Sequence, residues 1–222
     1  MTALENIDCY AKPTADLTPR EREIAIELFR ANYREANVAY LEKSFGTLKH
    51  VAFALSGETP AGFALGETRI IDLPRLRGQS VALAGICCVS PEFRRRGLFG
   101  QLERAAMMAS GIQQLPWLSC GRMAHPASMR TMRDNPTLVP KPGVPPSAWH
   151  REIGQALADI YGVHRFDPET FVCIGGGTPI GYPVMEIEAS SEEWDAFRHV
   201  DRSRGDALLG MCWQGGAAPA RW

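Results

Sequence analysis

The sequence predicts one mixed α/β (α+β) domain, in which helices flank a central, mostly antiparallel sheet, followed by a C-terminal extension. Helical spacing of apolar residues alternates with short apolar runs bounded by glycine and proline, and 222 residues suffice to bury a sizeable core. The expected segments in chain order are helices at 18–34 and 38–45, strands at 50–55, 61–73 and 81–89, a helix at 98–110, a strand at 117–123 and a helix at 127–133.

Both expected N-terminal helices carry end signals. Thr18, Pro19 and Glu21 place an N-cap threonine, an N1 proline and an N3 glutamate in the order of a capping box. Apolar residues at helical spacing then extend to about Arg34. Gly46 follows the second apolar helix and predicts its end there.

The three strands that follow are joined by short connections, which predicts an antiparallel meander. A Ser-Gly-Glu-Thr-Pro turn at 56–60 separates the first two, and a loop through Arg77 and Gly78 separates the second and third.

The chain changes character at residues 136–146, which contain five prolines and exclude regular structure. This segment is either a surface linker or a loop over a substrate cleft. We therefore divide the chain into a core, 1–146, and an extension packed on it, 147–222. The extension is expected to contain an amphipathic helix at 147–161, strands at 171–174 and 183–187, a helix at 190–200 with a Ser190–Glu193 capping box, a strand at 207–213 and a frayed tail from Gln214.

Composition excludes several functional classes. The net charge of −1 favours neither nucleic acid nor an anionic membrane. No run of about 20 apolar residues predicts a membrane helix, and the first 16 residues lack the apolar core of a signal peptide. Six cysteines show no paired or metal-ligand spacing, so we expect reduced thiols, no metal and a cytoplasmic location.

The most informative segment is the connection from the strand 81–89 to the helix 98–110. It is basic and glycine-punctuated, with the sequence Arg-Arg-Arg-Gly-Leu-Phe at 94–99. The first N–H groups of a helix have no internal partner, and the helix dipole adds positive potential there. The sequence therefore predicts a diphosphate site at this turn.

Arg94-Arg95-Arg96-Gly97-Leu98-Phe99 also resembles the Arg/Gln-x-x-Gly-x-Gly/Ala acyl-CoA signature of the GCN5-related N-acetyltransferases (the GNAT superfamily), and Val89-Ser90-Pro91 matches the Val-x-Pro that precedes it. The order of elements over 18–139 is similar as well. The resemblance implies that the strand 81–89 splays from the strand 117–123, with the pantetheine arm of acyl-CoA between them. It implies these cofactor-binding residues: Cys87, Cys88, Val89, Arg94, Arg95, Arg96, Gly97, Leu98, Phe99 and Gly100.

The sequence departs from the family at the catalytic residues. No carboxylate lies between Val81 and Val89, where many relatives supply a glutamate, and Met132 stands where the family's tyrosine falls. Substitutes are Glu67 as base, His125 as proton shuttle and Cys120 as nucleophile. Each has a plainer reading, respectively an exposed strand carboxylate, a helix cap and a buried thiol.

The resemblance implies an enzyme that transfers an acyl group from acetyl-CoA or another acyl-CoA to an amine of a small molecule. Tyr33, Tyr40 and Trp117 are expected to line the acceptor pocket. Two alternatives remain. One is other thioester chemistry, with an acyl-carrier protein as donor or malonyl decarboxylation. The other is an acyl-CoA-binding module without catalysis. The extension is also expected to offer a homodimer interface.

Overall fold

The computed structural model describes residues 7–222 and divides into two compact units. The described part of the first unit comprises residues 7–68, 83–113 and 180–186, and the second comprises residues 69–82, 114–179 and 187–222. Two long strands, β4 (Thr59–Leu73) and β5 (Leu76–Val89), contribute residues to both units. The boundary predicted after residue 146 falls inside the second unit, and the division into core and extension stays a prediction.

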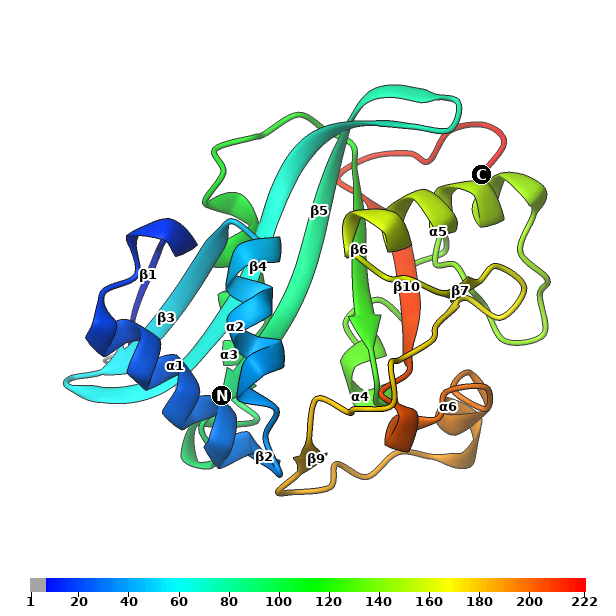
Figure 1. Cartoon of the computed structure of the whole chain (residues 1–222). Coiled ribbons are helices and arrows are strands. Elements are labelled where there is room, and N and C mark those ends of the chain that lie inside the picture. Colours follow the sequence, from blue (N-terminus) through cyan, green and yellow to red (C-terminus); the bar gives the residue numbers. More distant parts are fainter. Residues whose placement is uncertain (1–6) are drawn as a thin grey trace. The chain divides into compact units, whose positions relative to one another are not determined.

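The first unit is built on the strand order β1–β3–β4–β5, with antiparallel pairing of β1 to β3 and of β3 to β4 (Figure 1). A separate antiparallel pair joins β2 to β9. The other elements of this unit are β1 (Ile7–Pro13), a 3-10 turn (Thr14–Asp16), α1 (Pro19–Asn32), β2 (Tyr33–Arg34), α2 (Val38–Thr47), β3 (His50–Ser56), a 3-10 turn (Pro91–Phe93), α3 (Leu98–Met108) and β9 (Tyr182–Pro183).

Side-chain size on the two faces of this sheet decides how closely helices approach it. Small residues line the face that α3 covers, and they pack against apolar side chains of that helix. This cluster is Ala52, Ala54, Ala61, Ala64, Val89, Leu98, Leu102 and Ala106. The alternate residue Phe53 points to the opposite face, where its ring lies 6.3 Å from that of Phe63. The small residues allow α3, and with it the turn before α3, to lie close to the strands.

The second unit continues from β5 in the strand order β5–β6–β10–β8–β7. The strand β10 pairs antiparallel with both β6 and β8, and the helix α5 buries Trp149, Ile153 and Leu157. Its further elements are β6 (Trp117–Met123), α4 (Pro126–Met129), α5 (Ala148–Ile160), β7 (Phe166–Asp167), β8 (Val172–Cys173), α6 (Ser191–Asp195), a 3-10 turn (Arg202–Arg204) and β10 (Ala207–Gln214).

The predicted mixed α+β class with a large, mostly antiparallel sheet is confirmed. Local signals were the most reliable guides. The capping boxes at Thr18 and Ser190 both form, and the strand predicted at 117–123 has those bounds. None of the helices within residues 7–222 is long and apolar enough to cross a membrane.

Two predicted helix ends in the first unit are wrong. The helix expected to reach Arg34 ends at Asn32, because the next two residues pair as β2 with β9, a partner about 150 residues away. Gly46 does not stop α2, which continues to Thr47; the N–H of Leu48 still donates to the carbonyl of Ser44 at 3.0 Å.

Several predicted bounds elsewhere also change. The loop expected at 77–78 lies inside β5, and the chain turns instead at Pro74 and Arg75, where Arg75 takes a φ of 63°. The strand expected at 183–187 is reduced to Tyr182–Pro183, whose ladder partners are Tyr33 and Arg34 of β2, and Val184 and Ile187 are exposed. The remaining shortened elements are the helices expected at 98–110, 127–133, 147–161 and 190–200 and the strand expected at 171–174, now α3, α4, α5, α6 and β8.

The tail after β10 is packed rather than frayed. The Trp222 indole donates to the carbonyl of Thr137 at 2.7 Å, and its ring lies 5.8 Å from Trp149 and 5.4 Å from Trp213. Aromatic rings at such distances hold the last residues against the second unit.

Candidate functional site

The turn between β5 and α3 contains two residues with a left-handed backbone conformation. Gly97 is the N-cap of α3 with a φ of 80°, and Arg95, two residues earlier, has a φ of 62°. A left-handed conformation is unusual for a residue with a Cβ. Gly97 has no Cβ and therefore avoids the steric cost of this conformation. No heavy atom lies within 4 Å of the position where a Cβ would stand.

The backbone N–H groups of residues 95–100 have no acceptor within the described part of the chain. The first bond of the helix is donated by Gln101 to the carbonyl of Gly97, at 3.3 Å. Successive backbone N–H groups in a turn conformation form a concavity that binds anions, and the dipole of the helix that follows adds positive potential. The arrangement can hold an anion with several oxygen atoms.

The three arginines of the turn differ in their surroundings. Arg95 and Arg96 are exposed, and the Arg96 guanidinium lies 5.7 Å from the centre of the Phe93 ring. Arg94 is partly buried, with Nε donating to the carbonyl of Val89 at 3.1 Å and Nη2 donating to Oδ1 of Asn32 at 2.8 Å. Two guanidinium groups are thus open to an approaching anion, whereas the third holds neighbouring protein groups.

Close packing fixes the strand beneath this turn. A Cβ on Gly62 of β4 would stand 2.7 Å from the carbonyl oxygen of Cys88 and 2.9 Å from Cδ1 of Leu102. Cys88 is buried and Cys87 partly buried, and burial raises the pKa of both thiols. Both side chains are therefore neutral thiols at physiological pH. Pairing of a pantetheine arm with residues 87–89 stays a prediction.

Two glutamates of the first unit are candidates for proton transfer. Glu67 lies on β4 with only 1% of its surface exposed, so the alternative of an exposed strand carboxylate is wrong. Glu103, which the sequence reading missed, lies on α3, and burial raises its pKa to about 7. The signal was available, because Glu103 follows Phe99 by four positions and precedes Ala106 by three, and both pack against the core cluster. A carboxyl with that pKa can exchange a proton near neutral pH.

The candidates His125, Cys120 and Trp117 lie in the second unit, on or after β6. His125 caps α4, accepting the N–H of Ala127 at 3.1 Å through Nδ1, which matches the capping alternative. Burial raises the pKa of the Cys120 thiol to about 12, against the opposing effect of the Tyr161 hydroxyl. Cys120 is therefore a protonated core thiol. Trp117 is partly buried at the start of β6.

The two tyrosine candidates lie in the first unit with the turn. Tyr33 belongs to β2, and its ring packs 5.1 Å from that of Phe29. Tyr40 is partly buried on α2. Both tyrosines stay predicted pocket residues.

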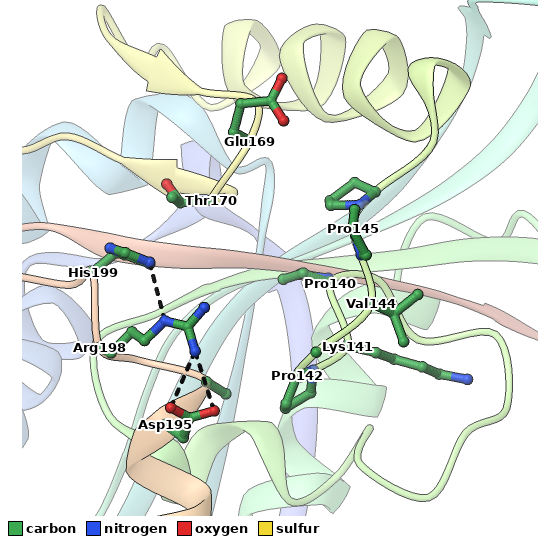
Figure 2. A pocket seen from close by; sticks show the side chains of 13 residues that line it. Pro140, Lys141, Pro142, Val144, Pro145, Glu169, Thr170, Asp195, Arg198 and His199 are labelled. Carbon is green, nitrogen blue, oxygen red and sulfur yellow. Dashed lines mark hydrogen bonds and ion pairs between the residues drawn. The ribbon is translucent and has the colours of Figure 1, made fainter.

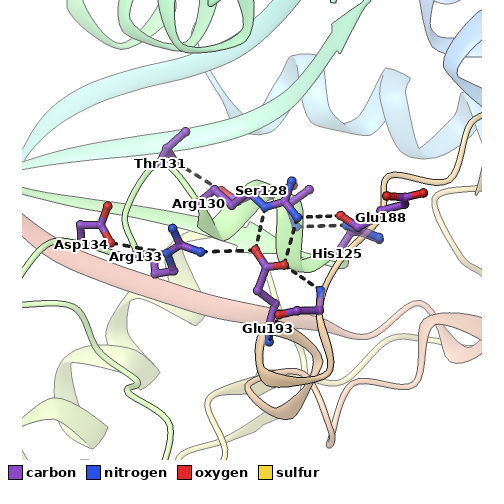
Figure 3. A network of polar contacts seen from close by, with 10 residues as sticks. His125, Ser128, Arg130, Thr131, Arg133, Asp134, Glu188 and Glu193 are labelled. Carbon is purple, nitrogen blue, oxygen red and sulfur yellow. Dashed lines mark hydrogen bonds and ion pairs between the residues drawn. The ribbon is translucent and has the colours of Figure 1, made fainter. Parts of the chain in front are cut away.

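An ion-pair network fixes the segment after β6 (Figure 3). Arg130 donates to both carboxylate oxygens of Glu193, at 2.7 and 3.0 Å, and to the carbonyl of Glu188 at 2.6 Å. The same Glu193 side chain closes the capping box of α6. Its hydrogen bonds with Arg130 and with the N–H of Ser190 lower the pKa of Glu193 to about 2. The end of α4 is thereby tied to α6 within the second unit.

The proline-rich segment lines a cavity of the second unit with a volume of about 250 Å³ (Figure 2). Arg198 donates to His199 Nε2 at 3.1 Å and to the Asp195 carboxylate at 3.2 and 3.4 Å on the wall opposite the prolines. Within residues 7–222, no group of three or more His, Cys, Asp or Glu side chains could hold a metal ion.

Comparisons with known proteins give matches in structure only. No family model and no curated protein matches the chain, whereas 68 solved chains do. One is an aminoglycoside acetyltransferase from an uncultured soil metagenomic sample, 18% identical, with a TM-score of 0.33 over 45% of this chain. The chain spans 66% of the length of that protein.

Two further solved structures match part of the chain. An acyl-CoA N-acyltransferase from Pseudomonas aeruginosa is 25% identical, with a TM-score of 0.34 over 51% of this chain and 78% of that one. A GCN5-related N-acetyltransferase from Kribbella flavida is 16% identical, with a TM-score of 0.40 over 57% of this chain and 32% of that one. Each of these likenesses covers part of the chain, with TM-scores of 0.33 to 0.40.

Proposed function

We propose that the chain is an acyl-CoA-dependent acyltransferase of the GCN5-related type, which moves an acyl group from acetyl-CoA or another acyl-CoA to an amine of a small molecule. The observation that carries the proposal is the run of backbone N–H groups at residues 95–100 without an acceptor in the described part of the chain, in a turn that also contains the exposed Arg95 and Arg96. A diphosphate has the charge and the oxygen atoms to satisfy this array. The six free cysteines support a cytoplasmic setting for the enzyme.

In the proposed reaction, the nitrogen of a neutral amine attacks the thioester carbonyl carbon and forms a C–N bond. The C–S bond then breaks, and CoA leaves as a thiolate that takes up a proton while the amine loses one. The fold holds the donor at its diphosphate. The reaction then needs the amine to be positioned against the thioester and one group that accepts the proton of the amine. Glu103 and Glu67 are the proposed proton acceptors of the first unit, and His125 that of the second. The raised pKa of Glu103 supports the first of these.

One observation favours a different use of the same site. Met132, which stands where the family's tyrosine falls, has a thioether that cannot donate a proton to a leaving thiolate. Malonyl decarboxylation needs no amine acceptor, and a carrier-protein donor would replace CoA altogether. Binding without turnover is the third reading. Malonyl-CoA supplied without acceptor separates decarboxylation from acetyl transfer.

The test is thermal stabilisation by CoA, acetyl-CoA and malonyl-CoA, applied to the wild type, Gly97→Glu and Gly46→Glu. Both substitutions add one carboxylate at an open glycine of the first unit, but only Gly97 lies in the turn. Ligand at 100 times its Kd adds about 2.7 kcal/mol, which raises the Tm by roughly 5–10 °C for a chain of this size.

We expect this rise in the wild type and in Gly46→Glu, and its loss in Gly97→Glu. Equal rises in all three proteins would place CoA elsewhere and refute the site. Stabilisation without release of free thiol from any donor or carrier protein, across a panel of amines, would refute the transferase and leave the binding module.

A further inference from the structure

The side chain of Asn32, the last residue of α1, joins parts of the first unit that lie far apart in sequence. Its Nδ2 donates to the carbonyl of Leu28 at 2.8 Å, and its Oδ1 accepts Nη2 of Arg94 at 2.8 Å. Its backbone carbonyl accepts the N–H of Val184 at 2.9 Å. With the amide nitrogen used on one side and the amide oxygen on the other, the orientation of the Asn32 side chain is fixed.

Arg94 connects this helix end to the strand end. Its Nε donates to the carbonyl of Val89, the last residue of β5, at 3.1 Å, while Nη2 reaches Asn32. The planar guanidinium therefore bridges two acceptors with fixed relative geometry, which an ammonium group on a flexible stem reproduces poorly. Its positive charge also lies at the C-terminal end of α1, where a cation is favourable.

The bridge lies directly before the backbone that presents the N–H groups. Arg94 precedes Arg95, whose φ of 62° is one of the two left-handed conformations of the turn. A non-glycine residue keeps such a conformation only where its surroundings hold it. The side chain of Arg94, anchored at two points, restrains the chain at that position.

We propose that Arg94 and Asn32 are a positioning pair, which holds the turn in its diphosphate-binding conformation without touching the ligand. The inference rests on the proposed acyl-CoA function and adds to it the residues that shape the anion site from inside. Asn32 is far from the motif in sequence, so only the fold brings it to this role.

The experiment is calorimetric titration of the full chain with CoA and with pantetheine, which lacks the diphosphate. The variants are Asn32→Ala, Arg94→Lys and the double variant, with Arg20→Lys as a control at an exposed arginine of α1. Circular dichroism establishes folding, and Arg94→Lys keeps the charge should Asn32→Ala fail to fold.

We expect Asn32→Ala and Arg94→Lys each to weaken CoA binding at least tenfold and pantetheine binding less than twofold. The double variant should bind CoA no more weakly than the poorer single variant. Either single substitution already breaks the Arg94–Asn32 hydrogen bond, so the second has nothing further to remove. Arg20→Lys should bind CoA like the wild type.

The inference is overturned if Asn32→Ala binds CoA like the wild type, or if the two single losses add in full, since direct contact of Arg94 with the ligand would give additivity. A uniform loss of CoA and pantetheine would show a general structural role and also overturn it. A wild type that fails to bind CoA at all refutes the proposed function, and the inference with it.

Discussion

Substitution of Gly62 by alanine tests the close packing that places α3 and its turn. The added Cβ would stand 2.7 Å from the carbonyl oxygen of Cys88, 2.9 Å from Cδ1 of Leu102 and 3.3 Å from Cα of Val89. The leucine side chain can rotate away, but the two backbone atoms move only if β5 shifts. Overpacking of this kind costs about 1–3 kcal/mol. Loss of glycine flexibility in the unfolded chain offsets about 0.4–1 kcal/mol of that cost.

The net expectation is a loss of about 1–2 kcal/mol in the free energy of unfolding, or roughly 2–8 °C in Tm. Urea denaturation followed by circular dichroism measures it. Gly46→Ala is the matched control: Gly46 is exposed within α2 with nothing within 4 Å of a new Cβ, so alanine should stabilise by up to about 1 kcal/mol. If Gly62→Ala unfolds at the same urea concentration as the wild type, the account of the packing is wrong.

Three further predictions concern single side chains. Burial lowers the pKa of His150, whose Nδ1 accepts the N–H of Ser147 in a capping box. The neutral imidazole should therefore stabilise the fold fully above pH 6.5, and this stabilisation should be lost as the pH falls below that value. The urea midpoint of His150→Gln should fall less with acid than that of the wild type. Asp206 accepts the N–H of Gly175 at 2.8 Å with 1% of its surface exposed; Asp206→Ala should cost about 2–4 kcal/mol in the same urea assay, and a smaller loss than 1 kcal/mol would contradict its bonding. Cys120→Ala should keep thioester turnover within about twofold because its thiol stays protonated, whereas a hundredfold fall in kcat would restore Cys120 as nucleophile.

Signals that act within one turn of the chain predicted most of the helices and strands. The capping boxes at Thr18 and Ser190 depend on residues three positions apart, and both form. The extents of elements were harder, because distant partners set them. Tyr33 and Arg34 continue a helical pattern, yet pairing with residues 182–183 converts them to a strand. Gly46, typical of a helix end, stays helical inside α2.

The candidate site likewise has one part that the sequence predicts and one part that depends on distant partners. The anion-binding turn could be predicted because strand, basic glycine turn and helix are contiguous. The surroundings of its side chains could not: Arg94 faces Asn32 across 62 residues, which no local pattern contains. For Glu103, the spacing from Phe99 and Ala106 predicts a side chain close to the core cluster, but the size of its pKa shift depends on how deeply the fold buries the carboxyl group.

The central claim is that residues 95–100 bind the diphosphate of CoA through their backbone N–H groups. Titration of the ¹⁵N-labelled protein with CoA, followed by the chemical shifts of its backbone amides, tests it directly. We predict the largest, saturable changes at residues 95–100, with downfield proton shifts as the N–H groups gain acceptors. Changes confined to other residues, such as the cavity lined by 140–146, or no saturable change at all, would contradict the account.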